Sequence, residues 1–173
     1  AWGEDYHQVL KKRFLKLCSI YQARFPENNF SAYTDTGPVS ERVFAKHAGI
    51  GWIGKNTCLI NTKAGSFLFL TAILTDLELA ADQAQSDHCG NCTRCIEACP
   101  TNAIENMTGE PKLADKYWIN SNKCIAYLTI EHRDEIDKDL QPKIGNNIFG
   151  CDICQDVCPW NKKSPRTSDP NFQ

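Results

Sequence analysis

The sequence predicts an α+β fold in two parts, followed by a short linker. The 173 residues carry 42% hydrophobic and 23% charged side chains, a globular balance that excludes global disorder. The first half mixes a helical apolar pattern with runs typical of strands, whereas the second concentrates eight of the ten cysteines between residues 89 and 158. Because residues 80–88 are small and polar, we expect the parts to span residues 1–83, 84–163 and 164–173.

Residues 4–25 predict one amphipathic helix, which Pro26 ends. A cluster of basic residues lies mostly off the apolar face of this helix. Such a cluster is typical of a solvated surface, and the alternative interpretation is contact with a polyanion. The cluster comprises Lys11, Lys12, Arg13 and Lys16. The apolar residues recur at three- and four-residue steps, so we expect them to pack in the core. They are Tyr6, Val9, Leu10, Phe14, Leu17, Ile20, Tyr21 and Phe25.

Residues 31–56 predict a loop, a helix and a second loop. Pro38 suits the first turn of the helix and Gly49 its C-terminal end. Asp35 is then expected just before the helix, where an aspartate most often caps the helix or forms an Asx turn. Three glycines in residues 49–54 allow the second loop to approach either a ligand or another strand closely.

Residues 57–75 predict a β-hairpin. Its two arms, 57–60 and 67–75, are rich in β-branched and large apolar residues, and Gly65 supplies the turn between them. Because the second arm is apolar on both faces, we expect it inside a sheet rather than at an edge.

A complete iron–sulfur motif opens the second part. Residues 89–100 read C-x2-C-x2-C-x3-C-P, in which three cysteines bind one [4Fe–4S] cluster and the fourth ligates another. Residues 151–159 repeat the last three cysteines and the proline, with Ile148 where the first cysteine would stand. Cys124 is the other thiol nearby.

These spacings predict two [4Fe–4S] clusters that together use eight thiols. The first set is Cys89, Cys92, Cys95 and Cys158, and the second is Cys99, Cys124, Cys151 and Cys154. Five disulfides, as in a secreted protein, would leave the proline after Cys99 and Cys158 without a role. Paired zinc sites explain C-x2-C but not the full run. We expect Cys18 and Cys58 to be buried core thiols.

Several blocks resemble the epoxyqueuosine reductase family, in family order over nearly the whole chain. They read DTGPVSER at 35–42, AGIGWIGKNTCLI at 48–60, CIAYLTIEH at 124–132 and IGNNIFGCDICQDVCPWN at 144–161. The resemblance implies part of an α/β cobalamin-binding catalytic domain at 1–83 and a ferredoxin-like domain with two clusters at 84–163. Residues 164–173 would begin the linker to a C-terminal helical-repeat domain, and a further N-terminal segment would precede residue 1.

The resemblance implies reductive removal of the epoxide oxygen of epoxyqueuosine in tRNA, giving queuosine. Electrons would pass through the clusters to a cobalamin, and Asp35 matches the family's proton donor. Arg42 is a candidate for holding substrate or a phosphate, with a surface ion pair as the alternative. The implied cobalamin contacts are Lys55, Asn56, Leu59, Leu70, Ala126, His132, Arg133 and Asp152.

Two positions depart from the family pattern. Ala126 stands where serine is usual, which removes a side-chain hydrogen bond there. Residues 100–123 are longer than usual, and Gly109-Glu110-Pro111 marks an extra loop.

The expected partners are tRNA containing epoxyqueuosine and an unidentified electron donor. We expect a cytoplasmic monomer without membrane association, because no run of 18 apolar residues and no signal peptide is seen. The net charge of −2 excludes a strongly basic chain as a whole. Two alternatives remain: a corrinoid reductive dehalogenase-like enzyme acting on a small molecule, and a non-catalytic iron–sulfur electron carrier. Dependence on tRNA tests the first alternative, and cobalamin binding tests the second.

Overall fold

The computed structural model describes residues 3–107 and 117–172, so the extra loop predicted around Gly109 lies outside the described residues. Helices and strands are mixed, as expected for an α+β chain. The chain divides into two compact units, which are described separately. Unit 1 comprises Ala1–Trp52, Leu68–Gln85 and Pro165–Gln173, and unit 2 comprises Ile53–Phe67 and Ser86–Ser164.

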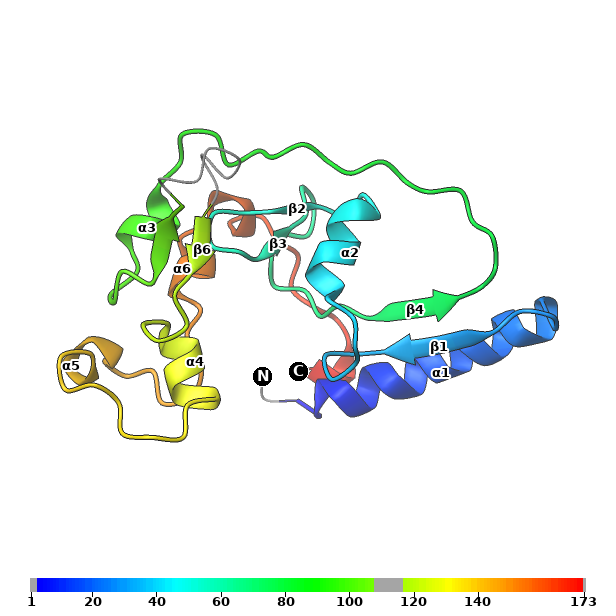
Figure 1. The fold of residues 1–173 in the computed structure, drawn as a ribbon, viewed down its shortest axis with the longest axis horizontal. Coiled ribbons are helices and arrows are strands. Elements are labelled where there is room, and N and C mark those ends of the chain that lie inside the picture. The colour runs from blue at the N-terminus through cyan, green and yellow to red at the C-terminus, as the bar shows by residue number, and fades with distance from the viewer. Residues whose placement is uncertain (1–2, 108–116, 173) are drawn as a thin grey trace. The chain divides into compact units, whose positions relative to one another are not determined.

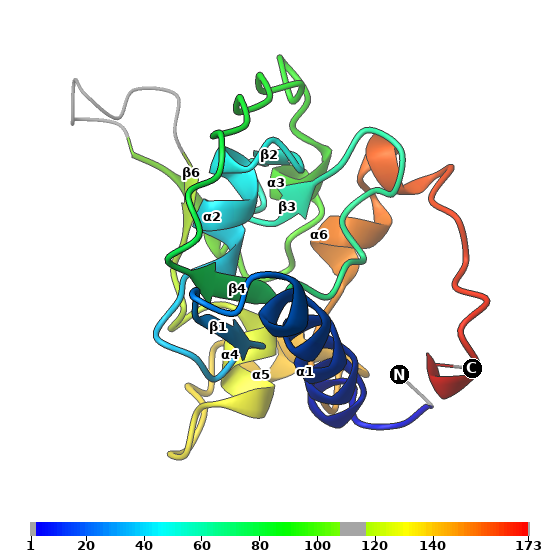
Figure 2. The same cartoon turned by 90° about the vertical axis from the view of Figure 1, so that its right-hand side faces the viewer.

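Unit 1 is organised around helix α1 (Tyr6–Arg24), which confirms the predicted helix. Asp5 caps its start, because its carboxylate accepts a hydrogen bond from the His7 backbone N–H at 2.9 Å. Strand β1 (Phe30–Tyr33) pairs antiparallel with β4 (Ala72–Thr75). Helix α1 lies along this two-stranded ribbon in both views (Figures 1 and 2).

The apolar face of α1 is only partly buried, contrary to the sequence expectation. Val9 and Cys18 are buried, whereas Ile20 is 55% exposed. The 19 residues of α1 extend about 28 Å. The four-residue strands extend only about 13 Å, so within the described residues they cannot cover the full length of the helix.

The predicted hairpin over residues 57–75 is wrong. Strand β4 pairs with β1, while β3 (Leu59–Ile60) pairs with β2 (Trp52–Ile53). At the predicted turn, Gly65 forms only an isolated antiparallel β-bridge with Asn61. Within the described residues β4 has a single partner strand, so its expected place inside a sheet is also wrong. Apolar patterning identifies strands, but partners far along the chain decide how they pair.

Helix α2 (Glu41–His47) confirms the second predicted helix with a later start. Ser40 is its N-cap residue, so Pro38 lies before the helix rather than in its first turn. Gly49 follows the helix with φ +67°, the left-handed conformation predicted for its C-terminal end. The loop expected at residues 31–33 is instead part of β1.

Besides β3, unit 2 consists of short elements within and around the cysteine motifs. They are α3 (Arg94–Glu97), β5 (Ile104–Asn106), β6 (Tyr117–Ile119), α4 (Ile125–Ile130), α5 (Gln141–Ile144), α6 (Ile153–Asp156) and η1 (Pro159–Asn161). Strands β5 and β6 pair antiparallel, and α3 and α6 lie side by side (Figure 1). The last element, η2 (Pro170–Phe172), belongs to unit 1. No helix among the described residues is long and apolar enough to cross a bilayer.

The compact units differ from the predicted division in two respects, one of which is that residues 165–173, predicted as a separate linker, cluster with unit 1. The predicted boundary after residue 83 lies close to the start of the unit 2 segment at Ser86, but residues 53–67 cluster with the cysteine-bearing unit. Within this segment, a Cβ on Gly54 would lie 2.4 Å from Cδ1 of Ile60. The glycine-rich loop therefore approaches a neighbouring strand closely, one of its two predicted roles.

Candidate functional site

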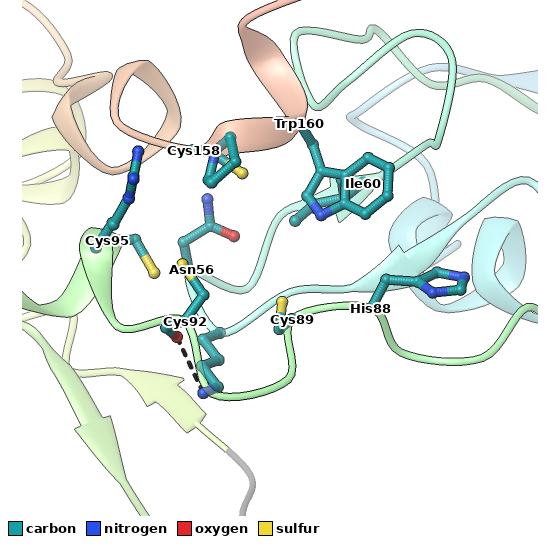
Figure 3. Close-up of a pocket in the computed structure, with 11 residues that line it drawn as sticks. Asn56, Ile60, His88, Cys89, Cys92, Cys95, Cys158 and Trp160 are labelled. Atoms are coloured by element: carbon teal, nitrogen blue, oxygen red, sulfur yellow. Dashed lines mark hydrogen bonds between the residues drawn. The ribbon is translucent and has the colours of Figure 1, made fainter.

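The first predicted cysteine set surrounds one cavity in unit 2. The cavity has a volume of about 220 Å³, and all four thiols line it (Figure 3). The loop before α3 and the first turn of that helix carry Cys89, Cys92 and Cys95. The residue directly before η1 is Cys158. Folding therefore brings the two motifs together around a single space. Trp160 also lines this cavity, beside His88 at a ring-centroid distance of 5.8 Å.

The four thiols of the second set also lie near one another. Burial is the main cause that raises the pKa of Cys151, and the charges of Cys154, Cys124 and Cys99 raise it further. All ten cysteines are free thiols, so the disulfide interpretation has no support. Cys18 is buried as expected, but Cys58 is only half-buried.

The thiol environments suit ligands of a cationic centre. Burial raises the pKa of Cys95 to about 11, and the neighbouring charges of Cys154, Cys89 and Cys92 add to the shift. Gathered thiolates repel one another unless iron offsets their charge, so binding would release protons. Within the described residues, no three His, Cys, Asp or Glu side chains are placed to hold a single metal ion.

Cys99 differs from its neighbours because hydrogen bonds reach its sulfur. The Ala103 N–H donates to the sulfur at 3.3 Å, and the Thr101 hydroxyl lies 3.6 Å from it. Burial raises the pKa of Cys99, but these hydrogen bonds outweigh burial and lower it overall. Such donors help to set the reduction potential of a cluster.

Lys55 and Asn56, both expected to contact cobalamin, line the thiol cavity. The Lys55 ammonium donates to the carbonyl oxygens of Gly90 at 2.7 Å and of Cys92 at 3.0 Å. Asn56 is 1% exposed, and its amide donates to the Cys154 carbonyl at 3.4 Å. Both side chains therefore hold the loops that carry cysteines. This role could not be predicted from the sequence, because the hydrogen-bond partners of both side chains are distant along the chain.

We expect Lys55→Met to weaken cluster retention without unfolding unit 2. Methionine keeps a long apolar side chain but removes two charge-assisted hydrogen bonds, a loss on the order of 1–3 kcal/mol. Iron release to a chelator should be faster in Lys55→Met than in the unmodified protein. Lys63→Met, at an exposed turn position, is the matched control. Equal release rates in the two variants would contradict a clamping role for Lys55.

A second clamp, also missed from the sequence, is formed by Asn161. Its amide nitrogen donates to the Ser66 hydroxyl and to the Gln155 carbonyl, both at 2.8 Å. Its oxygen accepts from the Ser66 N–H at 2.7 Å. Asn161 therefore ties the 53–67 segment to α6, which carries Cys154.

The other predicted cobalamin contacts are dispersed. Leu59 is buried at 4% exposure in β3. Ala126 lies half-buried in α4, and His132 follows that helix with its ring centroid 6.2 Å from that of Tyr127. Arg133 and Asp152 are exposed. None of these five residues is among those lining the thiol cavity.

Asp35 lines a separate cavity of about 210 Å³ within unit 1. Arg42 and Leu70, two other predicted site residues, line the same cavity. Asp35 has a φ of +58°, a conformation uncommon for residues other than glycine. Ser40, not Asp35, occupies the N-cap position of α2, and it makes no side-chain capping hydrogen bond there.

Three residues that the sequence analysis did not place at the site lie around Asp35. His7 Nε2 is 3.1 Å from Asp35 Oδ2. Burial raises the pKa of Tyr6, and the charge of Asp35 and a hydrogen bond with it raise it further. Glu41 lines the cavity, and its Oε1 is buried without a hydrogen-bond partner in the described chain. A buried acceptor left unpaired is costly, so this oxygen suits a hydrogen-bond donor on a ligand.

Comparison with known proteins assigns the family. Residues 88–161 match the model described as a 4Fe-4S double cluster binding domain, and residues 1–36 match Epoxyqueuosine reductase QueG, DUF1730. An epoxyqueuosine reductase of Xanthomonas campestris pv. campestris is 46% identical over 173 residues, covering 100% of this chain and 46% of the relative. The chain belongs to the epoxyqueuosine reductase family.

Solved structures of this family have the same fold. An epoxyqueuosine reductase from Streptococcus thermophilus matches with a TM-score of 0.83 at 34% identity, covering 99% of this chain and 44% of that one. An epoxyqueuosine reductase solved with an epoxyqueuosine-modified tRNA stem loop matches with a TM-score of 0.85 at 33% identity, covering 99% and 43%. The chain spans about half the length of the curated relatives it matches.

Proposed function

We propose that this chain is the part of an epoxyqueuosine reductase that holds two [4Fe–4S] clusters and the proton donor. The whole protein would remove the epoxide oxygen of epoxyqueuosine in tRNA to give queuosine. The observation that carries this proposal is the convergence of thiols from two distant motifs on one cavity, in a chain related to these reductases over its whole length.

Two clusters would be held by the eight predicted thiols. The first would use Cys89, Cys92, Cys95 and Cys158, and the second would use Cys99, Cys124, Cys151 and Cys154. The residues fit this role, since four thiols line the first cavity and Cys99 accepts hydrogen bonds at its sulfur. The Lys55 and Asn56 side chains would keep these ligand loops in place.

A cobalamin is also part of the proposal. Leu70 lines the Asp35 cavity, and the side chains of Arg133 and Asp152 are exposed, so all three suit contacts with a large cofactor. Ala126 and His132 are half-buried, so only part of each side chain is accessible to a cofactor. Since the side chains of Lys55, Asn56 and Leu59 are engaged or buried, their contacts would go through the backbone. When bound, the clusters would pass electrons one at a time to the cobalamin, which would supply the reducing power that opens the epoxide.

The residues around Asp35 would bind and orient the substrate. Asp35 would give a proton to the departing oxygen, and the unpartnered Glu41 oxygen would accept a hydrogen bond from a substrate hydroxyl or amine. Arg42 would contact a phosphate or the substrate itself. The Tyr6 ring, stacked on Phe69 at 4.3 Å, would form an apolar wall that excludes water.

The proposed partners are tRNA containing epoxyqueuosine and an electron donor. With a net charge of −2, this part of the protein would contribute local rather than global attraction for tRNA. We further propose that the whole protein acts as a monomer in the cytoplasm.

The test uses the full-length protein, reconstituted without oxygen and supplied with a low-potential reductant. We expect conversion of epoxyqueuosine to queuosine in tRNA, measured by mass spectrometry of the digested nucleosides. Reduction of small organohalides without reaction on tRNA would favour the dehalogenase-like alternative. Electron transfer to acceptors without either reaction would favour the electron carrier.

A further inference from the structure

We propose that His7 positions the carboxyl group of Asp35 and resupplies it with a proton during the reaction. This inference rests on the proposed function and assigns a role to a residue outside the recognised motifs. His7 acts through Asp35, so it is a positioning residue rather than a catalytic one.

The geometry places His7 between two carboxylates. Its Nδ1 lies 2.8 Å from Asp5 Oδ1, and its Nε2 lies 3.1 Å from Asp35 Oδ2. A protonated imidazole donates from both ring nitrogens, so both carboxylates are satisfied when the ring is charged. Asp35 comes from the loop before α2, 28 positions along the chain, so this contact depends on the fold of unit 1.

The charges around His7 favour its protonated form. The hydrogen bond to Asp35 is the largest cause that raises its pKa, followed by the hydrogen bond to Asp5. Its place in the first turn of α1 works against the charge, since helix N-termini favour anions. The titratable groups beside His7 in the chain and on the adjacent turn of α1 are Glu4, Asp5, Tyr6 and Lys11. Those lining the Asp35 cavity are Tyr6, Asp35, Glu41 and Arg42.

The stoichiometry of the reaction requires a second proton. Converting an epoxide to an alkene breaks two C–O bonds and forms one C=C bond and two O–H bonds, so two electrons and two protons are consumed and water is released. A low-potential donor supplies the electrons one at a time. In this proposal Asp35 enters the reaction as the carboxylic acid, with Oδ2 still accepting from the His7 imidazolium. The proton on its other oxygen goes to the epoxide oxygen when the first C–O bond breaks.

His7 then restores Asp35 for the second step. The proton on His7 Nε2 passes to Asp35 Oδ2, and Asp35 gives it to the oxygen as water leaves. The imidazole side chain is 36% exposed, so His7 regains a proton from solvent after turnover. The hydrogen bond from His7 also fixes the direction of the Asp35 carboxyl, which is 60% exposed.

The first test measures the titration of His7 itself, independent of turnover. NMR of the full-length protein with ring-labelled histidine should show His7 titrating above the ordinary histidine pKa of about 6.5. The shift should fall in Asp35→Asn, while His47, an exposed residue at the end of α2, should not respond. An ordinary pKa for His7 in the unmodified protein, or no change in Asp35→Asn, would overturn the proposal.

The second test measures turnover against pH. The unmodified enzyme should lose kcat as pH rises through the raised pKa of His7, because the imidazolium is then lost. His7→Gln should lower kcat by about 10²-fold, keep the cluster and cobalamin spectra and lose this pH dependence. In His7→Ala, added imidazole should restore part of the rate, and His47→Gln serves as the control.

The outcomes separate this inference from the proposed function. No epoxide reduction by the unmodified enzyme would overturn the proposed function and the role of His7 with it. Normal reduction by both the unmodified enzyme and His7→Gln, with the same pH profile, would overturn the role of His7 alone.

Discussion

Asp35→Asn is expected to lower the rate of epoxide reduction by about 10²–10⁴-fold. The amide has nearly the shape of the carboxyl group but cannot supply an acidic proton to the departing oxygen. Asparagine also tolerates the φ of +58° at this position better than most residues, so the fold of unit 1 should be retained. The comparison is of kcat on epoxyqueuosine-containing tRNA, with equal iron and cobalt content in both proteins.

Glu27→Gln is the control for Asp35→Asn, because it removes an exposed carboxylate in the turn after α1. It should leave kcat unchanged. Full activity of Asp35→Asn with intact cofactors would show that the proton reaches the substrate from another group.

Cys158→Ala is expected to reduce the iron content from about eight to about four atoms per chain. Cys158 lines the same cavity as the thiols of residues 89–95, although it belongs to the other motif. Its loss removes the fourth ligand of one cluster, whereas the second cysteine set stays complete. Because electrons would then lack one relay, epoxide reduction should also fail.

Cys58→Ser provides the matched control for Cys158→Ala. Cys58 forms a hydrogen bond with Cys154, and this bond is the largest cause that raises the pKa of Cys154. Serine keeps a hydrogen-bonding group at this position. Since Cys58 is outside both predicted ligand sets, Cys58→Ser should retain full iron. Loss of a cluster in Cys58→Ser, or full iron in Cys158→Ala, would contradict the proposed ligand assignment.

The cysteine sets were the most predictable feature because their spacing is a local signal with strict chemical meaning. In the C-x2-C-x2-C-x3-C-P motif the first three cysteines bind one cluster and the fourth binds the other cluster. In agreement with this, Cys158 of the second motif lines the same cavity as the first three cysteines of the first motif. Helix α1 was also predictable, since its periodicity lies within the helix itself. The hairpin was not, because β4 finds its partner β1 about forty residues earlier.

The side chains around Asp35 could not be predicted from the sequence for the same physical reason, namely that they are distant along the chain. His7 and Tyr6 come from α1, and Tyr6 matches an ordinary core pattern in the sequence. The structural role of Lys55 was hidden likewise, since its carbonyl partners lie in the cysteine loop. Motifs name residue types at fixed spacing, whereas long-range contacts form only after packing.

The measurement that tests the central claim most directly is metal analysis of the full-length protein after anaerobic reconstitution with iron, sulfide and cobalamin. The account predicts about eight iron atoms and about one cobalt atom per chain, with a visible spectrum showing both cofactors. Iron without cobalt would contradict the proposed reductase chemistry and leave an iron–sulfur electron carrier as the better description.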